Sequence, residues 1–186
     1  KKYVSGVLAQ ILYVGAQIMC WTYIYQYAEA IGMDAVTAGY YQMAAFVIFT
    51  IGRAIGTYML RFMSSGKLLM YFALLAVTFV LGTIFIQNIV GLYCLVGVSF
   101  CMSLMFPTIY AISLHGLGDD AKLGAAGLVM AILGGAIVPV FQAVFIDTYS
   151  VAFSYVVPAG CFIIVAAYAA FDLKTKVRVF NNVAPC

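Results

Sequence analysis

Charged residues are scarce in this chain. Its 186 residues include nine basic and six acidic side chains, which is 8% of the total, whereas 66% are hydrophobic. A water-soluble domain of this length carries about 25% charged residues, because its surface must face water. The surface of this chain must therefore face an apolar medium, and a lipid bilayer is the simplest candidate. The net charge of +3 sits at the ends of apolar segments and gives no reason to expect nucleic-acid binding.

The sequence also lacks the patterns of metal sites and catalytic centres. The five cysteines show no CxxC spacing, His115 is the single histidine, and no glycine-rich phosphate loop is present. The paired Asn-Pro-Ala turns of aquaporin-type channels are missing as well. We therefore expect no enzyme and no metal or organic cofactor. We expect the thiols to behave as small apolar side chains.

Between the few charges lie apolar runs that are long enough to cross a membrane. A helix rises about 1.5 Å per residue, so roughly 20 residues span a hydrocarbon core of ~30 Å. The sequence therefore predicts an all-α membrane fold, with a cytoplasmic tail over residues 172–186. The six predicted transmembrane helices cover residues 4–31, 37–62, 67–87, 91–115, 124–147 and 151–171.

The distribution of basic residues predicts the orientation of these helices. Lysine and arginine precede the first segment and occur in the second and fourth connections and in the tail, whereas the other three connections hold none. Short cytoplasmic loops are enriched in these residues. Both ends of the chain are therefore expected to be cytoplasmic.

The first predicted helix carries an unusual polar and aromatic stripe. Tyr13, Gln17, Trp21 and Tyr25 recur every four residues, which places them along one side of a helix. Amides and hydroxyls within a membrane are costly unless they meet a partner or a water-filled cavity. Two interpretations remain open: the amide and the indole contact a sugar, or they pack and bond between helices. Glu29, near the end of this helix, is interpreted as a solvated interfacial charge.

Arg53 is the single charge well inside a predicted helix. A charge within the membrane is a candidate functional group. It lies only eight residues before Arg61, at the expected cytoplasmic end, so its long side chain can reach towards the interface. We favour a structural or gating role for Arg53 over substrate contact. Gly52 and Gly56, four residues apart, would let a neighbouring helix approach closely.

Two prolines are expected to interrupt helices. Pro107 and Pro139 fall inside the fourth and fifth predicted spans, and each removes a backbone donor. No carboxylate falls at the centre of any predicted span. This matters because proton-coupled transport usually needs one.

Four segments resemble the L-fucose/proton symporters, a family of sugar porters in the major facilitator superfamily. They occur in the family's order and together cover most of residues 7–148. YVGAQ at 13–17 followed by Cys20-Trp21 resembles helix seven of the family, and IGR at 51–53 through Gly56-Thr57 to Arg61-Phe62 resembles helix eight. FPTI at 106–109 through GLG at 116–118 to Lys122 and Gly124 resembles helix ten, and Val129-Met130 through GGAI at 134–137 resembles helix eleven.

The resemblance implies a transporter of twelve helices, of which these are the last six. It implies proton-coupled uptake of L-fucose, galactose or glucose by alternating access in a bacterial inner membrane, with sodium as the coupling ion in some relatives. The expected partners are the monosaccharide, the lipid bilayer and an N-terminal six-helix half. In this family the acidic residues of proton coupling lie in that other half, which agrees with the missing carboxylate here.

The resemblance also favours the sugar interpretation of the stripe. Gln17 and Trp21 are expected to contact sugar, with Tyr25, Gln42 and Ser103 as further candidates on helices that could line a cavity. Structural or gating roles are expected for Gly52, Arg53, Gly56, Arg61 and Pro107. The alternative is a stand-alone six-helix membrane protein with a structural or assembly role. An upstream reading frame encoding six further hydrophobic segments would exclude that alternative.

Overall fold

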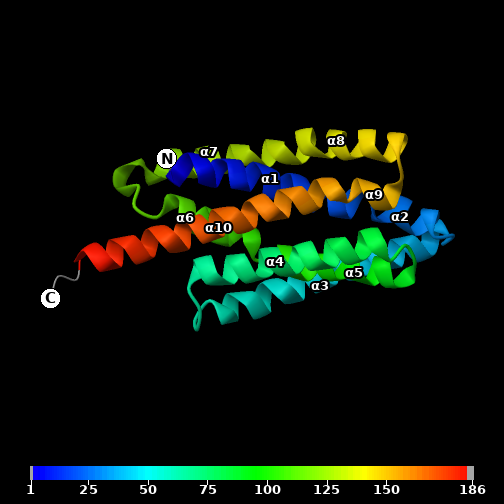
Figure 1. The fold of residues 1–186 in the computed structure, drawn as a ribbon, viewed down its shortest axis with the longest axis horizontal. Coiled ribbons are helices and arrows are strands. Elements are labelled where there is room, and N and C mark those ends of the chain that lie inside the picture. The colour runs from blue at the N-terminus through cyan, green and yellow to red at the C-terminus, as the bar shows by residue number, and fades with distance from the viewer. Residues whose placement is uncertain (1, 184–186) are drawn as a thin grey trace.

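The computed structural model describes residues 2–183, apart from the side chains of Lys2, Asp119 and residues 176–183. This part of the chain is a bundle of helices (Figure 1). Six stretches are long and apolar enough to cross a membrane, which confirms the predicted fold class. They are Tyr3–Thr22, Ala35–Met59, Ser65–Phe85, Ile89–Leu114, Ala121–Thr148 and Val151–Thr175.

Several spans consist of more than one helical segment. The α-helices are α1 Lys2–Thr22, α2 Ile24–Ala30, α3 Ala35–Met59, α4 Ser65–Phe85, α5 Ile89–Met102, α6 Met105–Leu114, α7 Ala121–Met130, α8 Gly134–Thr148, α9 Val151–Ser154 and α10 Val156–Val183; the short 3₁₀ helices are η1 Gly118–Asp120 and η2 Ala131–Leu133. The helix predicted over 4–31 is thus divided at Tyr23. The last helix continues through most of the predicted tail.

Two of the divisions follow from prolines. A proline in a helix cannot donate to the carbonyl four residues earlier and crowds that carbonyl. Pro107 stands four residues after Ser103, where α5 gives way to α6, and Pro158 stands four residues after Ser154, where α9 ends. The expected interruption at Pro139 is wrong, because α8 continues through it. The interruption of that span lies earlier, at η2.

The helices lie roughly parallel, with α3 and the α7–α8 span at opposite edges of the bundle (Figure 1). Helix α1 packs against α8, α10 and α6, and α3 packs against α5. Only 17% of the most apolar stretch of α3 and 22% of that of the α7–α8 span is buried, compared with at least 44% in the other four spans. These two edge elements therefore have the most surface left for lipid or for another protein segment.

Glycines allow the α7–α8 span to approach α1 closely. A side chain at Gly134 would collide with the backbone carbonyl of Ile11, and one at Gly15 would meet Val138 at 2.5 Å. Towards the start of the chain, the space next to Gly127 is filled by the Tyr3 side chain, and that next to Gly124 is filled by Leu117 and by the Tyr3 ring. The contact between α1 and the α7–α8 span is close because glycine has no side chain. Adding even a methyl group at these glycines should therefore push the helices apart.

The cysteine thiols lie within the packed helices. Cys20, Cys101 and Cys161 are buried, and Cys94 is half-buried. Cys186 lies outside the described residues. The described thiols thus occupy positions suited to small apolar side chains.

A pH-dependent cap begins α3. Asp34 accepts hydrogen bonds from the backbone N–H and the hydroxyl of Thr37, and these bonds hold the pKa of its carboxyl below the ordinary value. The cap therefore stabilises the first turn of α3 above the ordinary pKa of aspartate, and this stabilisation is lost as the pH falls through the lowered pKa. We expect amide exchange at Thr37, corrected for its intrinsic pH dependence, to accelerate at low pH, and Asp34→Ala to remove that acceleration.

Helix α5 supplies the control for this experiment. Its cap is Asn88, whose side chain accepts from the N–H of Val90 and does not titrate. Corrected exchange at Val90 should not depend on pH over the same range. Equal pH dependence at Thr37 and Val90 would contradict the assignment to Asp34.

Candidate functional site

Trp21 is fixed in position by two other helices. Its indole Nε1–H donates to Ser99 Oγ of α5 at 3.2 Å. Its ring stands nearly perpendicular to two phenylalanine rings of α3, with centroid distances of 4.9 Å to Phe46 and 5.0 Å to Phe49. The side chain remains half-buried. It is thus held in a defined orientation while part of its surface stays free for contact.

Helix α3 turns a polar side towards this tryptophan. Gln42, Phe46, Phe49 and Arg53 follow one another at intervals of four, three and four residues, which places them on one side of the helix. Since Phe46 and Phe49 contact Trp21, this side faces α1. Gln42 and Arg53 flank the aromatic contact, one turn to either side. We call Gln17, Trp21, Gln42, Phe46, Phe49 and Arg53 the polar face.

The other exposed side of α3 differs in chemistry. Val47, Ile51 and Ile55 are 53%, 51% and 44% exposed, as expected for residues that meet lipid tails. Between the two exposed sides, Gly52 and Gly56 are buried against α5 and the start of α6, close to Ser103 and Leu104. An exposed side that carries an arginine and an amide is unsuited to lipid and suits a water-filled or ligand-filled space.

The two glutamines of the polar face have capacity for further hydrogen bonds. Gln17 is half-buried on α1, one turn before Trp21. Gln42 is half-buried on α3, and its buried Oε1 has no hydrogen-bond donor among the described residues. An amide can both donate and accept, as a ligand rich in hydroxyl groups requires.

The structure places Tyr25 and Ser103 differently from the other candidates. Tyr25 is 40% exposed on α2, beyond the turn at Tyr23, and its hydroxyl lies close to Gly39 of α3. Ser103 is fully buried, and its Oγ donates to the Phe100 carbonyl at 2.7 Å. Ser103 therefore belongs to the packed contact between α3 and α5, away from the polar face.

The residues expected to have structural roles also have defined positions. Arg53 is exposed on the polar face of α3. Arg61 is exposed beyond the end of α3, with its guanidinium carbon 5.9 Å from the centre of the Tyr58 ring. Pro107 lies in the first turn of α6, next to the break at Ser103.

Three functional candidates were missed at the sequence level. Ser99 orients Trp21 but lies on another helix, and nothing in the sequence links the two. Gln10 is fully buried on α1 and could have been found from its spacing of seven residues to Gln17. Asp172, the first residue of the predicted cytoplasmic tail, is fully buried on α10 near Gly66 of α4. Within the described residues, no three histidine, cysteine or acidic side chains come together as metal ligands.

Comparison with known proteins identifies what this arrangement resembles. The L-fucose-proton symporter of Haemophilus influenzae is 46% identical over 173 residues, covering 90% of this chain and 40% of the relative. That of Escherichia coli is 38% identical over 173 residues, covering 91% and 40%. The chain is similar in sequence to the L-fucose/proton symporters. It spans about two fifths of these relatives' length, and it fits their C-terminal half.

Other relatives and a solved structure show the same similarity. A glucose/galactose transporter of Brucella abortus is 27% identical over 175 residues, covering 92% of this chain and 42% of the relative. The crystal structure of the major facilitator superfamily transporter FucP in the outward conformation matches with a TM-score of 0.89 at 38% identity, over 92% of this chain and 42% of that one. No protein-family model matches the chain. The named relatives are transporters, and the six apolar spans indicate that this chain is an integral membrane protein.

Proposed function

We propose that the chain is the C-terminal half of a secondary active transporter that takes up L-fucose or a related hexose together with protons. The observation that carries the proposal is the polar face, which combines amide, arginine and aromatic groups on helices that otherwise expose apolar side chains. The names of the relatives point to the same substrate class.

The polar face has the chemistry for one wall of a sugar site. Gln17 and Gln42 offer amide donors and acceptors to sugar hydroxyls. Trp21 offers an apolar surface for a pyranose ring, and its contacts with Phe46, Phe49 and Ser99 fix its orientation before substrate binds. Such preorganisation reduces the entropy lost on binding.

The second wall, in this proposal, comes from an N-terminal six-helix half. The exposed sides of α3 and the α7–α8 span would meet that half, with the polar face directed at the space between them. The acidic groups of proton coupling would lie there, because no predicted span of this chain carries a central carboxylate. Rocking of the two halves about the sugar would give alternating access.

The proposed membrane is a bacterial inner membrane, with both ends of this chain in the cytoplasm. Lys67 and Lys122, in the first turns of the spans that follow the second and fourth connections, support this orientation, and Lys174 near the end of the last span agrees with it. Asp34 and Asp147, close to the opposite connections, would face the outside.

Sugar uptake by the complete transporter tests the proposal. The full-length protein would be reconstituted in vesicles, and entry of radiolabelled L-fucose, galactose and glucose would be measured with and without an inward proton gradient. We expect at least one sugar to enter, at least several-fold faster with the gradient. Failure of all three sugars would contradict the sugar assignment and favour a structural or assembly role. An equal rate of sugar entry with and without the gradient would contradict proton coupling.

A further inference from the structure

Gln10 is a buried amide without an assigned task. It lies on α1, its side chain is fully buried, and neither its Nε2 nor its Oε1 has a hydrogen-bond partner among the described residues. Burying an amide in this way is costly, and nearly all buried polar groups in proteins are satisfied. Leucine would fill such a position without that cost. The presence of an amide at this position therefore indicates a role that needs its hydrogen-bonding groups.

Gln10 lies on a line of polar side chains along α1. Tyr3, Gln10 and Gln17 are spaced by seven residues, and Trp21 follows four residues after Gln17. Seven residues are nearly two full helical turns, so all four side chains point to the same side of α1. We call these four residues the polar line. It leads from the polar face, at Gln17 and Trp21, towards the start of the chain.

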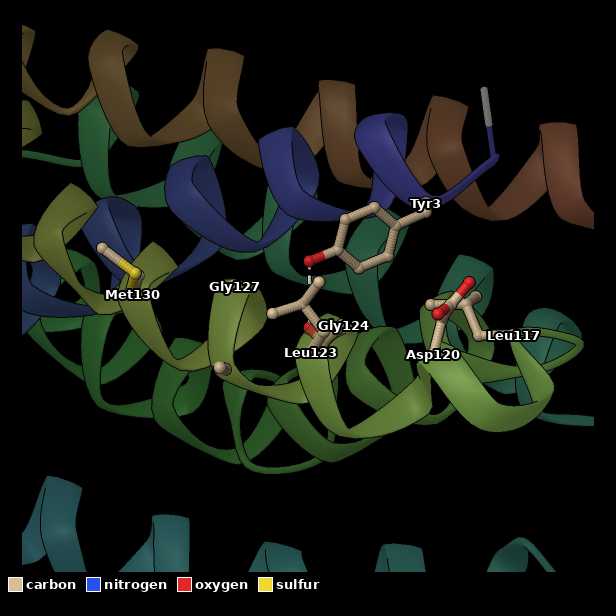
Figure 2. A pocket seen from close by; sticks show the side chains of 8 residues that line it. Tyr3, Leu117, Asp120, Leu123, Gly124, Gly127 and Met130 are labelled. Atoms are coloured by element: carbon tan, nitrogen blue, oxygen red, sulfur yellow. Dashed lines mark hydrogen bonds between the residues drawn. The ribbon is translucent and has the colours of Figure 1, made fainter.

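An open groove lies at the other end of this line. Figure 2 shows Tyr3 reaching from α1 over α7, with its hydroxyl directed at Gly124, whose carbonyl accepts its hydrogen bond at 2.9 Å. The groove has a volume of 560 Å³ and is lined by Tyr3, Leu117, Asp120, Leu123, Gly124, Ala126, Gly127 and Met130. In the proposed orientation it opens on the cytoplasmic side, so the polar line joins the polar face to that side.

The segment beside Gln10 contains a break in the helix. Gly134 touches the Ile11 backbone, next to Gln10, and directly before it α7 gives way to α8 through the 3₁₀ turn η2. A stretch of 3₁₀ helix within a longer helix often marks a hinge. Helix α7 contacts α1 through Tyr3, whose hydroxyl donates to the Gly124 carbonyl and lies against Gly127, and Leu123 and Met130 on α7 are largely exposed. Bending at η2 would move α7 away from α1 and uncover Gln10.

We propose that Gln10 is a second sugar contact, about 10 Å from Gln17 along α1, which the substrate meets as it passes towards the groove. In the structure described here the Gln10 amide is fully buried, and α7 lies against the start of α1 through the Tyr3–Gly124 hydrogen bond. When the cytoplasmic side opens, the amide exchanges hydrogen bonds with sugar hydroxyls and holds the sugar during release. This inference rests on the proposed sugar transport.

The chain offers a control for the effect of losing a buried glutamine. Gln142 on α8 is also fully buried, but its Nε2 donates to Ser154 Oγ of α9 at 3.0 Å. It does not belong to the polar line. Gln142→Leu therefore removes a buried amide whose hydrogen bond joins two helices, whereas Gln10→Leu removes one with no such bond.

The test compares sugar affinity at the two faces of the membrane. The full-length transporter and its Gln10→Leu, Gln10→Asn and Gln142→Leu variants would be reconstituted in inside-out and right-side-out vesicles. We expect Gln10→Leu to raise the half-saturating L-fucose concentration about tenfold at the cytoplasmic face and less than twofold at the outer face. Gln10→Asn should lie between wild type and Gln10→Leu, and Gln142→Leu should leave both faces within twofold of wild type.

Thermal unfolding distinguishes this role from a structural one. Gln10→Leu should unfold at or above the wild-type temperature, since leucine needs no partner, whereas Gln142→Leu should unfold below it. Unchanged half-saturation at the cytoplasmic face in Gln10→Leu, equal shifts at both faces, or failure of this variant to fold would each overturn the assignment of Gln10. A wild-type protein that transports no sugar would overturn the proposed function and this inference with it.

Discussion

Replacing Gln17 by alanine is expected to lower L-fucose uptake by the full-length transporter at least tenfold. The change removes an amide from the polar face, where it can both donate to and accept from sugar hydroxyls. Losing hydrogen bonds that leave buried partner groups unpaired costs about 1–3 kcal/mol, and 1.4 kcal/mol corresponds to a factor of about ten. The measurement is initial uptake in vesicles, normalised to the amount of folded protein.

Two variants on α2 serve as controls. Gln26→Ala makes the same chemical change at an exposed position, and Glu29→Gln neutralises an exposed charge near the end of that helix. Both should stay within twofold of wild type, because neither residue belongs to the polar face. If Gln17→Ala and Glu29→Gln had equal effects, the assignment of the sugar site to α1 would be wrong.

Gly134→Ala is expected to destabilise the bundle, because the methyl group it adds has no free space. Its new methyl would collide with the backbone carbonyl of Ile11, which cannot move aside as a side chain can. Helices α1 and α8 would have to separate, at a cost of about 2 kcal/mol, which lowers the melting temperature by roughly 5 °C. The displacement falls between Gln10 and Gln17, so transport should fall as well. Melting in detergent and uptake in vesicles would measure the two effects.

Gly160→Ala is the matched control for this substitution. Gly160 lies within α10, and a methyl group there would meet no atom within 4 Å. Alanine is the better helix former by about 1 kcal/mol, so this variant should melt at or above the wild-type temperature. If both alanine variants melted alike, close α1–α8 packing would not be the reason for the glycine at 134.

The number of spans was predictable because one property dominates it. A run of about 20 apolar residues has few alternatives to crossing a bilayer, and charges mark its ends. The divisions within spans were harder, because they depend on single residues. Pro107 correctly indicated a break, which lies at the carbonyl it cannot reach, four residues earlier at Ser103. Pro139 wrongly indicated another, since α8 accommodates it and places its carbonyl to accept from the Tyr23 hydroxyl.

The candidate site was predictable only one helix at a time. Periodicity indicates that Gln17 and Trp21 share a side of α1, but it cannot indicate which side of another helix they face. The contacts of Trp21 with Ser99 of α5 and with the two phenylalanines of α3 come from tertiary packing. The same limit explains Ser103, whose polar side chain serves packing, and Asp172, whose burial depends on α4.

The packing of the cysteines has a consequence for chemical labelling of this protein. A maleimide reacts with a thiolate in contact with water, and Cys20, Cys101 and Cys161 are shielded from it. Among the described residues, the half-buried Cys94 alone needs to be replaced before labelling. A cysteine introduced at position 10 would then report the opening of the cytoplasmic side, because its labelling rate measures how often α7 uncovers α1. The described part of the native bundle thus contributes little background to such a measurement.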